Sequence, residues 1–420
     1  MTTRRIFLSD IHMGDDRSVK KNPYPYCWFY DQTGSGGRPL MLESFLKDYC
    51  VSDKTVSEIV ILGDLFDEWV CPAEFNPTAP GSSQQTENIA NAKENQGVIK
   101  QLKTLAKQKR LKYVTGNHDM LTDDAIMQKL FPGIEFVSGF DGHGVYRADG
   151  IWAEHGHWYG LFNAPYPVPK ASGLAQSVLP LGFFITRILA EETLKTGKST
   201  SLLEVVAEWA GLIHSRVAQA RLRTRMTYSE RYGLSQEVLE GLLNTFVKNH
   251  AQGQPGAVMM GYGGVPKVVD WNAVKDRYGR IFSEWSGTHP DNVDPWEAIE
   301  SDYGRLHSAA SRLILRHGKA RIVIFGHTHE YECTSLLGPN PIVPPDEHAM
   351  PSDLSPVYAN AGAWTNETPR CTFVETEFNP GTRYHAVRVR EWKDVGGKYG
   401  AKEIDFCPDQ WVWVSSAGEG

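Results

Sequence analysis

The sequence predicts an α/β protein, and three features predict it. Short apolar runs typical of buried strands recur along the chain, amphipathic stretches typical of helices lie between several of them, and most runs end in Asp, Asn or His. In open α/β sheets, ligands bind at the carboxyl ends of the strands. The 420 residues are 41% hydrophobic and 22% charged, a balance typical of a globular protein with a sizeable core.

Three strands are expected near the N-terminus, and each runs directly into polar residues. They cover residues 5–8, 59–62 and 112–115, and they end in Ser9-Asp10-Ile11-His12, Gly63-Asp64 and Gly116-Asn117-His118-Asp119. Glycine at such a position allows the backbone to turn tightly. Helices are expected near 42–49 and 91–110, the second with a solvated lysine face, and residues 70–90 are expected to form a polar loop.

Later strands repeat this arrangement. They are expected over 151–154, 320–325, 357–359, 371–377 and 384–392. The first two end in His155-Gly156-His157 and Gly326-His327-Thr328-His329. Between residues 160 and 318, apolar residues recur at helical spacing. We therefore expect a core formed by 1–159 and 319–420, interrupted by a helical insertion or cap subdomain over 160–318.

Seven polar side chains follow the ends of these strands, and all are of types that bind Mn, Fe or Zn. They are Asp10, His12, Asp64, Asn117, His155, His327 and His329. No cysteine is among them, which argues against a structural zinc site. A single such residue is usually structural, but seven at the same end of successive strands suit two metals that share one carboxylate.

The remaining histidines have weaker claims. His157 lies two residues after His155 and is a less favoured ligand candidate. The others have no motif around them and are interpreted as structural: His289, His307, His317, His348 and His385.

Five motifs carry a resemblance to a known family. They are Asp10-x-His12, Gly63-Asp64-x-x-Asp67, Gly116-Asn117-His118-Asp119, His155 and Gly326-His327-x-His329. In this order they resemble the motifs of the calcineurin-like metallophosphoesterase superfamily, over about residues 1–160 and 318–395. The resemblance implies a four-layer αββα sandwich, to which the sequence adds a large helical insertion.

The resemblance also implies roles for single residues. Asp10, His12 and His329 would bind one metal, Asn117, His155 and His327 would bind the other, and Asp64 would bridge both. His118 would donate a proton to the leaving group or stabilise transition-state charge. Asp67 and Asp119 would orient ligand or catalytic imidazoles through hydrogen bonds. The sequence identifies no substrate-binding residue.

The implied reaction is hydrolysis of a phosphodiester, pyrophosphate or phosphomonoester bond. Two divalent ions, manganese being favoured over iron or zinc, would lower the pKa of a bridging water, so that hydroxide attacks phosphorus. The expected substrate is a phosphorylated small molecule or a lipid-linked molecule. The alternatives are a nuclease of the double-strand-break repair type, which the net charge of −7 disfavours, and a non-catalytic scaffold of the same fold, which the intact ligand set disfavours.

Finer details resemble one branch of the superfamily. Ser9–Gly14, Gly63–Trp69 and Asn360-x-Gly362-x-Trp364 are similar to the UDP-2,3-diacylglucosamine hydrolases. Those enzymes cleave a pyrophosphate bond of a lipid A precursor beneath a helical insertion. They typically carry Arg where this chain has His118, and their chains are much shorter. A protein Ser/Thr phosphatase would instead have Arg at position 68 and Glu at position 119.

The expected location is the cytoplasm. The chain enters its first strand at once, which leaves no room for the apolar part of a signal peptide. The most apolar window, 174–190, contains Pro180 and Arg187 and is short for a membrane span. Six cysteines without CxxC spacing indicate reduced thiols. We expect no transmembrane segment, while peripheral contact with a membrane stays open.

Overall fold

The computed structural model of the protein describes most of the expected core. The described residues are 2–15, 37–70, 84–137, 144–160, 162–164, 180–183, 186, 257–259, 267–269, 306–316, 318, 320–336, 355–365, 368–394, 396–404 and 407–414. Most of the expected insertion over 160–318 lies outside them, as do His289, His317 and His348. The division into core and insertion therefore stays a prediction.

The larger sheet brings together the strands of the first three motifs. It has eight strands in the order β14-β13-β12-β1-β2-β3-β4, with β15 paired to β13. The strands are β1 (Thr3–Leu8), β2 (Val56–Leu62), β3 (Leu111–Val114), β4 (Glu135–Phe136), β12 (Cys371–Asn379), β13 (Tyr384–Asp394), β14 (Tyr399–Glu403) and β15 (Gln410–Trp413). Because β1, β2 and β3 are parallel neighbours, the residues that follow them lie at one edge of the sheet.

The second sheet brings together the strands of the last two motifs. Its order is β10-β11-β9-β6-β5. The strands are β5 (Tyr146–Ala148), β6 (Ile151–Ala153), β9 (Ile322–Phe325), β10 (Tyr331–Ser335) and β11 (Val357–Ala361). Here β6, β9 and β11 are parallel, so their carboxyl ends also meet at one edge. A separate ladder of β7 (Ala257–Met259) and β8 (Lys267–Val269) lies within the block expected to be helical.

Strand β2 shows why the two sheets stack. Ile59 and Ile61 pack into the core beneath the helices, whereas Val60 and Leu62 pack between the sheets. All four are fully buried. A strand covered on both faces has apolar residues at every position, which is why this stretch shows no alternation in the sequence.

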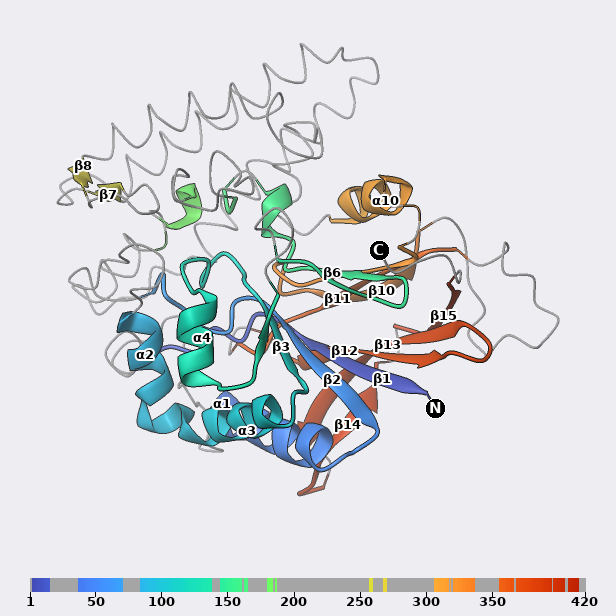
Figure 1. Ribbon diagram of the computed structural model, residues 1–420, viewed down its shortest axis with the longest axis horizontal. Coiled ribbons are helices and arrows are strands. Elements are labelled where there is room, and N and C mark those ends of the chain that lie inside the picture. Colours follow the sequence, from blue (N-terminus) through green and yellow to red (C-terminus); the bar gives the residue numbers. More distant parts are fainter. Residues whose placement is uncertain are drawn as a thin grey trace, which may run out of the picture.

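Helices complete a layered α/β structure, and Figure 1 shows them on the outer faces of the two sheets. The helices are α1 (Gly37–Ser44), the π-helix η1 (Phe45–Val51), α2 (Gln84–Asn91), η2 (Lys93–Asn95), α3 (Gln96–Lys107), α4 (Asp124–Leu130), η3 (His157–Tyr159) and α10 (His307–Arg316). Helices α1 to α4 share a core with the large sheet, while α10 lies against β9 of the second sheet. The predicted fold class is confirmed.

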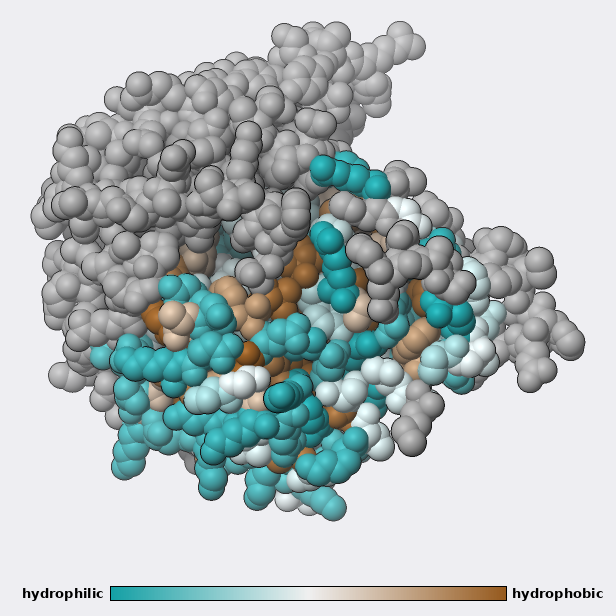
Figure 2. All heavy atoms as spheres, viewed as in Figure 1, coloured by the Kyte–Doolittle hydropathy of each residue, from teal (hydrophilic) through white to brown (hydrophobic). Residues whose placement is uncertain are grey.

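The expected strands are confirmed, but one loop prediction is wrong. Residues 84–91, expected to be polar loop, form helix α2. Its buried residues Gln85, Thr86, Ile89 and Ala90 recur at helical spacing, but only two of them are apolar, so the pattern was hidden. The expected lysine face is confirmed, since Lys93, Lys100, Lys103, Lys107 and Lys109 are all exposed. Figure 2 shows hydrophilic residues over this layer.

The described residues also answer two expectations about cysteines and membranes. Cys50, Cys333, Cys371 and Cys407 are buried free thiols, as predicted. No helix within the described ranges combines the length and the apolar character that a membrane crossing requires.

Candidate metal centre

The candidate ligands occupy sharp turns at the ends of the strands. Five of the seven have left-handed backbone, a conformation that L residues rarely adopt. They are Asp10 (φ 52°), His12 (φ 51°), Asp64 (φ 52°), His327 (φ 72°) and His329 (φ 60°). Residues in unfavourable backbone regions cluster at functional sites, where the surrounding structure holds them. This clustering marks the edge shared by the two sheets as a candidate site.

Glycines allow these turns to approach one another. A Cβ on Gly326 would lie 1.8 Å from Ser9 Oγ, and one on Gly116 would lie 2.1 Å from Asp64 Oδ1. Gly63, with φ +77°, would bring a Cβ to 2.4 Å from the backbone of Gly116. No side chain fits at such distances, so the glycines of three motifs are required for the turns to meet.

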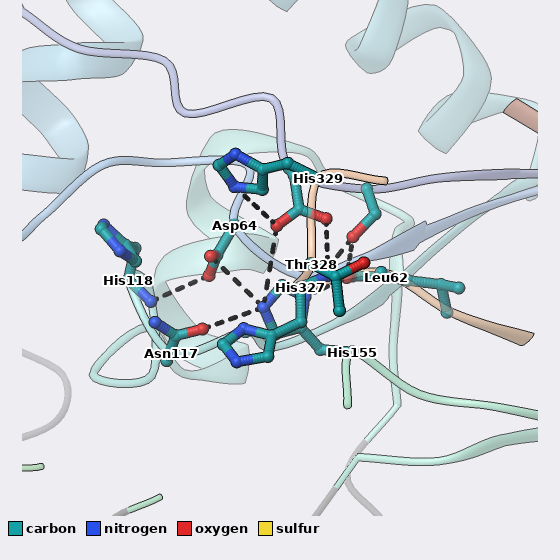
Figure 3. Close-up of polar contacts among 12 residues, drawn as sticks. Leu62, Asp64, Asn117, His118, His155, His327, Thr328 and His329 are labelled. Atoms are coloured by element: carbon teal, nitrogen blue, oxygen red, sulfur yellow. Dashed lines mark hydrogen bonds and ion pairs between the residues drawn. The ribbon is translucent and has the colours of Figure 1, made fainter. Parts of the chain in front are cut away.

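The first group of candidate ligands surrounds His12. Its Nε2 atom lies 3.8 Å from Asp10 Oδ1, 3.5 Å from Asp64 Oδ2 and 3.2 Å from His329 Nε2. His329 Nε2 in turn lies 3.4 Å from Asp10 Oδ1. These four side chains come from three different strand ends and from both sheets, and Figure 3 shows two of them, Asp64 and His329, close together.

The second group surrounds His155. Its Nε2 atom lies 3.3 Å from Asp64 Oδ2 and 2.9 Å from Asn117 Oδ1. The His327 ring packs edge to face against the His155 ring, with centroids 5.1 Å apart. Asp64 Oδ2 therefore lies between the two groups, close to one imidazole of each.

The spacing of these atoms fits metal ions. An ion bonded to N or O at about 2.0–2.2 Å holds neighbouring ligand atoms about 3.0–3.4 Å apart, close to the distances around His12 and His155. Asp10 Oδ1 is buried and hydrogen-bonds to no group among the described residues, as expected for an oxygen that serves an ion. In the described chain, three sets of groups have ligand atoms that all lie within 4.8 Å of one another: Asp10/His12/His329, Asp10/Asp64/His155 and His12/Asp67/His118.

Hydrogen bonds from the surrounding backbone orient the ligands. The carbonyl of Leu62 lies 2.7 Å from His155 Nδ1, which turns Nε2 toward Asp64. The backbone N–H groups of His327 and His118 donate to Asp10 Oδ2 and Asp64 Oδ1, each at 2.8 Å. Such outer contacts fix the direction of metal-binding atoms, here Asp10 Oδ1 and Asp64 Oδ2.

The two orienting carboxylates differ in what they hold. Asp67 Oδ1 lies 2.9 Å from His118 Nδ1 and Asp67 Oδ2 lies 3.4 Å from His12 Nδ1, the contacts that its expected role requires. Asp119 holds backbone instead of an imidazole. It accepts hydrogen bonds from three N–H groups, those of Leu65, Phe66 and Gly116. Its expected role therefore needs correction: Asp119 joins the turns after β2 and β3.

The charges of the site support one another. Burial opposes ionisation of Asp10 and Asp64, yet the nearby imidazoles, His155 foremost, hold the pKa of both carboxyls well below its usual range. Burial also opposes charge on His155, but Asp64 and Asp10 raise its pKa to about 9. For His327, burial and the positive His155 lower the pKa to about 3. A neutral imidazole is the form that binds metals.

Asp119 has a pKa shifted in the opposite direction. Burial and the like charge of Asp64 raise the pKa of Asp119 to about 6. Asp119 is thus harder to ionise than Asp10, Asp64 or Asp67, whose pKa values the nearby imidazoles lower.

The sequence did not single out Asn163. Asn117 Nδ2 donates to Asn163 Oδ1 at 3.3 Å, and Asn163 Nδ2 lies 3.3 Å from His327 Nε2. No motif marks this residue, so only the structure places it beside two candidate ligands.

Asn360 was quoted in the sequence only as part of a resemblance, and the structure shows what it does. Its amide donates to the Gly326 carbonyl at 2.9 Å and to Thr328 Oγ1 at 3.1 Å. The Asn360 side chain therefore holds the turn that carries His327 and His329.

The other described histidines have contacts of their own. The buried His157 ring packs against Trp158 at 4.5 Å and lies 5.3 Å from the His155 ring, and it belongs to none of the candidate metal-binding sets of the described chain. His307 pairs with Glu332, and His385 Nε2 lies 2.7 Å from the Asp149 carbonyl. These contacts agree with the structural interpretation of both residues.

Residues 3–182 match the family model described as calcineurin-like phosphoesterase. The match supports the superfamily that the five motifs resemble. It spans the first four motifs, whereas the fifth, Gly326-His327-x-His329, lies beyond its end. Together with the candidate metal-binding groups, it supports a metal-dependent phosphoesterase. The match names no branch, so likeness to UDP-2,3-diacylglucosamine hydrolases stays a prediction.

Two further comparisons give little more. No curated protein matches the chain. One solved structure, described as "Structure of PhoD", is similar with a TM-score of 0.29 and 9% sequence identity, over 100% of this chain and 73% of that chain. A likeness this weak carries no argument about fold or function.

Proposed function

We propose that the protein is a hydrolase of phosphoric esters that works with two divalent metal ions. The observation that carries the proposal is the position of Asp64 Oδ2, which lies 3.5 Å from His12 Nε2 and 3.3 Å from His155 Nε2. A carboxylate oxygen between two imidazole nitrogens is the arrangement that a shared ligand requires. Asp10, His12 and His329 would complete one site, and Asn117, His155 and His327 the other.

The ions, when bound, would activate water at neutral pH and neutralise charge on the phosphate oxygens. The protein supplies proton transfer through His118, whose Nδ1 is held by Asp67 at 2.9 Å. Its other ring nitrogen, Nε2, would give a proton to the departing oxygen, which lowers the cost of forming that oxygen as an anion. No protein nucleophile is needed, so we expect no covalent phospho-enzyme.

For the substrate, we propose a phosphorylated small molecule, with a lipid-linked UDP-sugar as the first candidate. The support is the similarity of Gly63–Trp69 and Asn360–Trp364 to enzymes that cleave such a pyrophosphate bond. The net charge of −7 makes a nucleic acid the weaker candidate. Contact with a membrane surface would accompany the lipid substrate only.

Hydrolysis of bis-p-nitrophenyl phosphate tests the reaction class. We expect turnover with added Mn²⁺ that is lost on chelation and restored by the ion. Absence of metal-dependent turnover with Mn²⁺, Fe²⁺ and Zn²⁺ would contradict the proposal. The substrate class is tested by comparing an acylated UDP-sugar with UDP-glucose, a cyclic nucleotide and DNA. Preference for the acylated sugar supports the lipid candidate, preference for DNA favours a nuclease, and equal rates leave the lipid candidate without support.

A further inference from the structure

Trp69 lies directly against the candidate proton donor. Its indole stacks on the imidazole of His118 with ring centroids 4.2 Å apart and ring planes 23° from parallel. Trp69 is 2% exposed and His118 is 7% exposed, so the stack is enclosed. Trp69 follows the second motif by two residues, and nothing in the proposed reaction uses it.

Two other contacts of His118 restrict its ring without fixing the ring plane. Asp67 Oδ1 holds Nδ1 at 2.9 Å, and the His12 ring meets the imidazole edge to face at a centroid distance of 4.5 Å. Asp67 Oδ1 is itself held by the backbone N–H of Val70 at 3.0 Å. A hydrogen bond to one nitrogen still permits the ring to swing about that bond. The stacked indole face restrains the plane of the ring.

The stack continues into the segment at 180–183, within the block expected to be an insertion. Phe183, which is 2% exposed, meets the Trp69 indole edge to face at 6.0 Å and 86°. A Cβ on Gly182 would lie 3.1 Å from Trp69 Cζ3, so this segment packs closely against the indole. Edge-to-face and stacked aromatic pairs are favoured geometries, and here they succeed one another from Phe183 to Trp69 to His118.

We infer that Trp69, supported by Phe183, is a positioning residue that holds the His118 imidazole in the plane from which Nε2 reaches the leaving oxygen. This inference rests on the proposed function, because it assigns His118 to the departing group. Its consequence is selective. A displaced donor slows reactions whose leaving oxygen needs a proton, while esters with a stable leaving anion are spared.

A pair of diesters measures this selectivity. Phenolate from diphenyl phosphate is more basic than p-nitrophenolate from bis-p-nitrophenyl phosphate, so it depends more on proton donation. For Trp69→Ala in the Mn²⁺-loaded full chain, we expect kcat on diphenyl phosphate to fall about 10- to 100-fold. On bis-p-nitrophenyl phosphate we expect a fall of about threefold or less, with two ions still bound. Trp69→Phe keeps an aromatic face, so its kcat on diphenyl phosphate should stay close to that of the wild type.

Two further variants separate positioning from general loss of packing. Trp392→Ala removes an indole of the same burial, 3% exposed and bonded to Ser44, and should leave the ratio of the two rates unchanged. Phe183→Leu keeps bulk beside Trp69 but removes the aromatic edge, and should show the same selective loss in milder form. If Trp69→Ala does not fold, the two single variants are compared instead: Phe183→Leu should show the selective loss and Trp69→Phe should not.

The outcomes distinguish this inference from the proposed function. Equal loss on both diesters in Trp69→Ala, or loss of bound ions, overturns the role of Trp69. If His118→Ala shows the selective loss and Trp69→Ala does not, only the inference about Trp69 fails. If His118→Ala itself shows no selectivity, the donor role of His118 fails and the inference fails with it. If the wild-type protein hydrolyses neither ester, the proposed function is wrong.

Discussion

Replacement of Asn360 by Ala tests whether the Asn360 side chain holds the turn of the fifth motif in its metal-binding conformation. Asn360 is 1% exposed at the end of β11. Its amide donates to Gly326 O and Thr328 Oγ1, and its carbonyl oxygen accepts from Gly362 N at 3.0 Å. The bonds therefore tie together the turn of His327 and His329 and the turn after β11.

The magnitude follows from the groups left behind. Asn360→Ala leaves the buried carbonyl of Gly326 and the N–H of Gly362 without their hydrogen-bond partner. Each lost bond with its unsatisfied group costs about 1–1.5 kcal/mol. With the small cavity added, we expect a loss of about 3 kcal/mol in the free energy of unfolding. His327 and His329 both have left-handed backbone, so a loosened turn relaxes away from the binding geometry. We expect Mn²⁺ affinity to fall about 10- to 100-fold.

Calorimetric titration of Mn²⁺ into the chelated protein measures this affinity, and denaturation measures stability. Tyr358→Phe is the matched control. It removes only the hydroxyl that lies 3.2 Å from Asn360 Nδ2 and leaves the bonds to the turn in place, so its Mn²⁺ affinity should stay within about twofold, because no contact to the ligands' turn is lost. High Mn²⁺ should restore turnover in Asn360→Ala. Lost stability with unchanged Mn²⁺ affinity would refute the reasoning, since Asn360 would then support only β11.

The remaining predictions concern the shared ligand and one buried histidine. Asp64→Asn tolerates the left-handed backbone and should weaken both ion sites together and abolish turnover, whereas His118→Ala should keep both ions. Metal analysis of the purified variants decides, and two ions with near-full activity in Asp64→Asn would contradict the shared role. Burial lowers the pKa of His385 from 6.5 to about 4, so the unfolded chain binds more protons between these values. Stability should therefore fall by about 3 kcal/mol as pH drops from 6.5 to 4. Denaturation of His385→Gln, which keeps a donor near the Asp149 carbonyl, should lack this component, and identical pH profiles would show the histidine to be irrelevant.

The local sequence pattern was sufficient to predict the strands of this protein and the types of residue that follow them. The runs at 6–8, 59–62 and 322–325 are apolar because both faces of these strands are buried, and the residue that ends each run is visible in the sequence itself. Parallel neighbouring strands expose their carboxyl ends at one edge of a sheet, so a common site for Asp10, Asp64 and Asn117 was predictable from pattern alone. Helix α2 was not predictable in this way, because two of its buried residues, Gln85 and Thr86, are polar and the helix therefore shows little apolar periodicity.

Only the tertiary structure decided which groups hold one another. Asp67 and Asp119 stand at similar places in two similar motifs, yet Asp67 contacts two imidazoles while Asp119 takes three backbone N–H groups. Asn360 reaches a turn 34 residues away along the chain, and Trp69 lies on His118 although no spacing rule links them. Strand burial is read from neighbours in sequence, whereas these contacts depend on which strand ends become neighbours within each sheet, which no local pattern encodes.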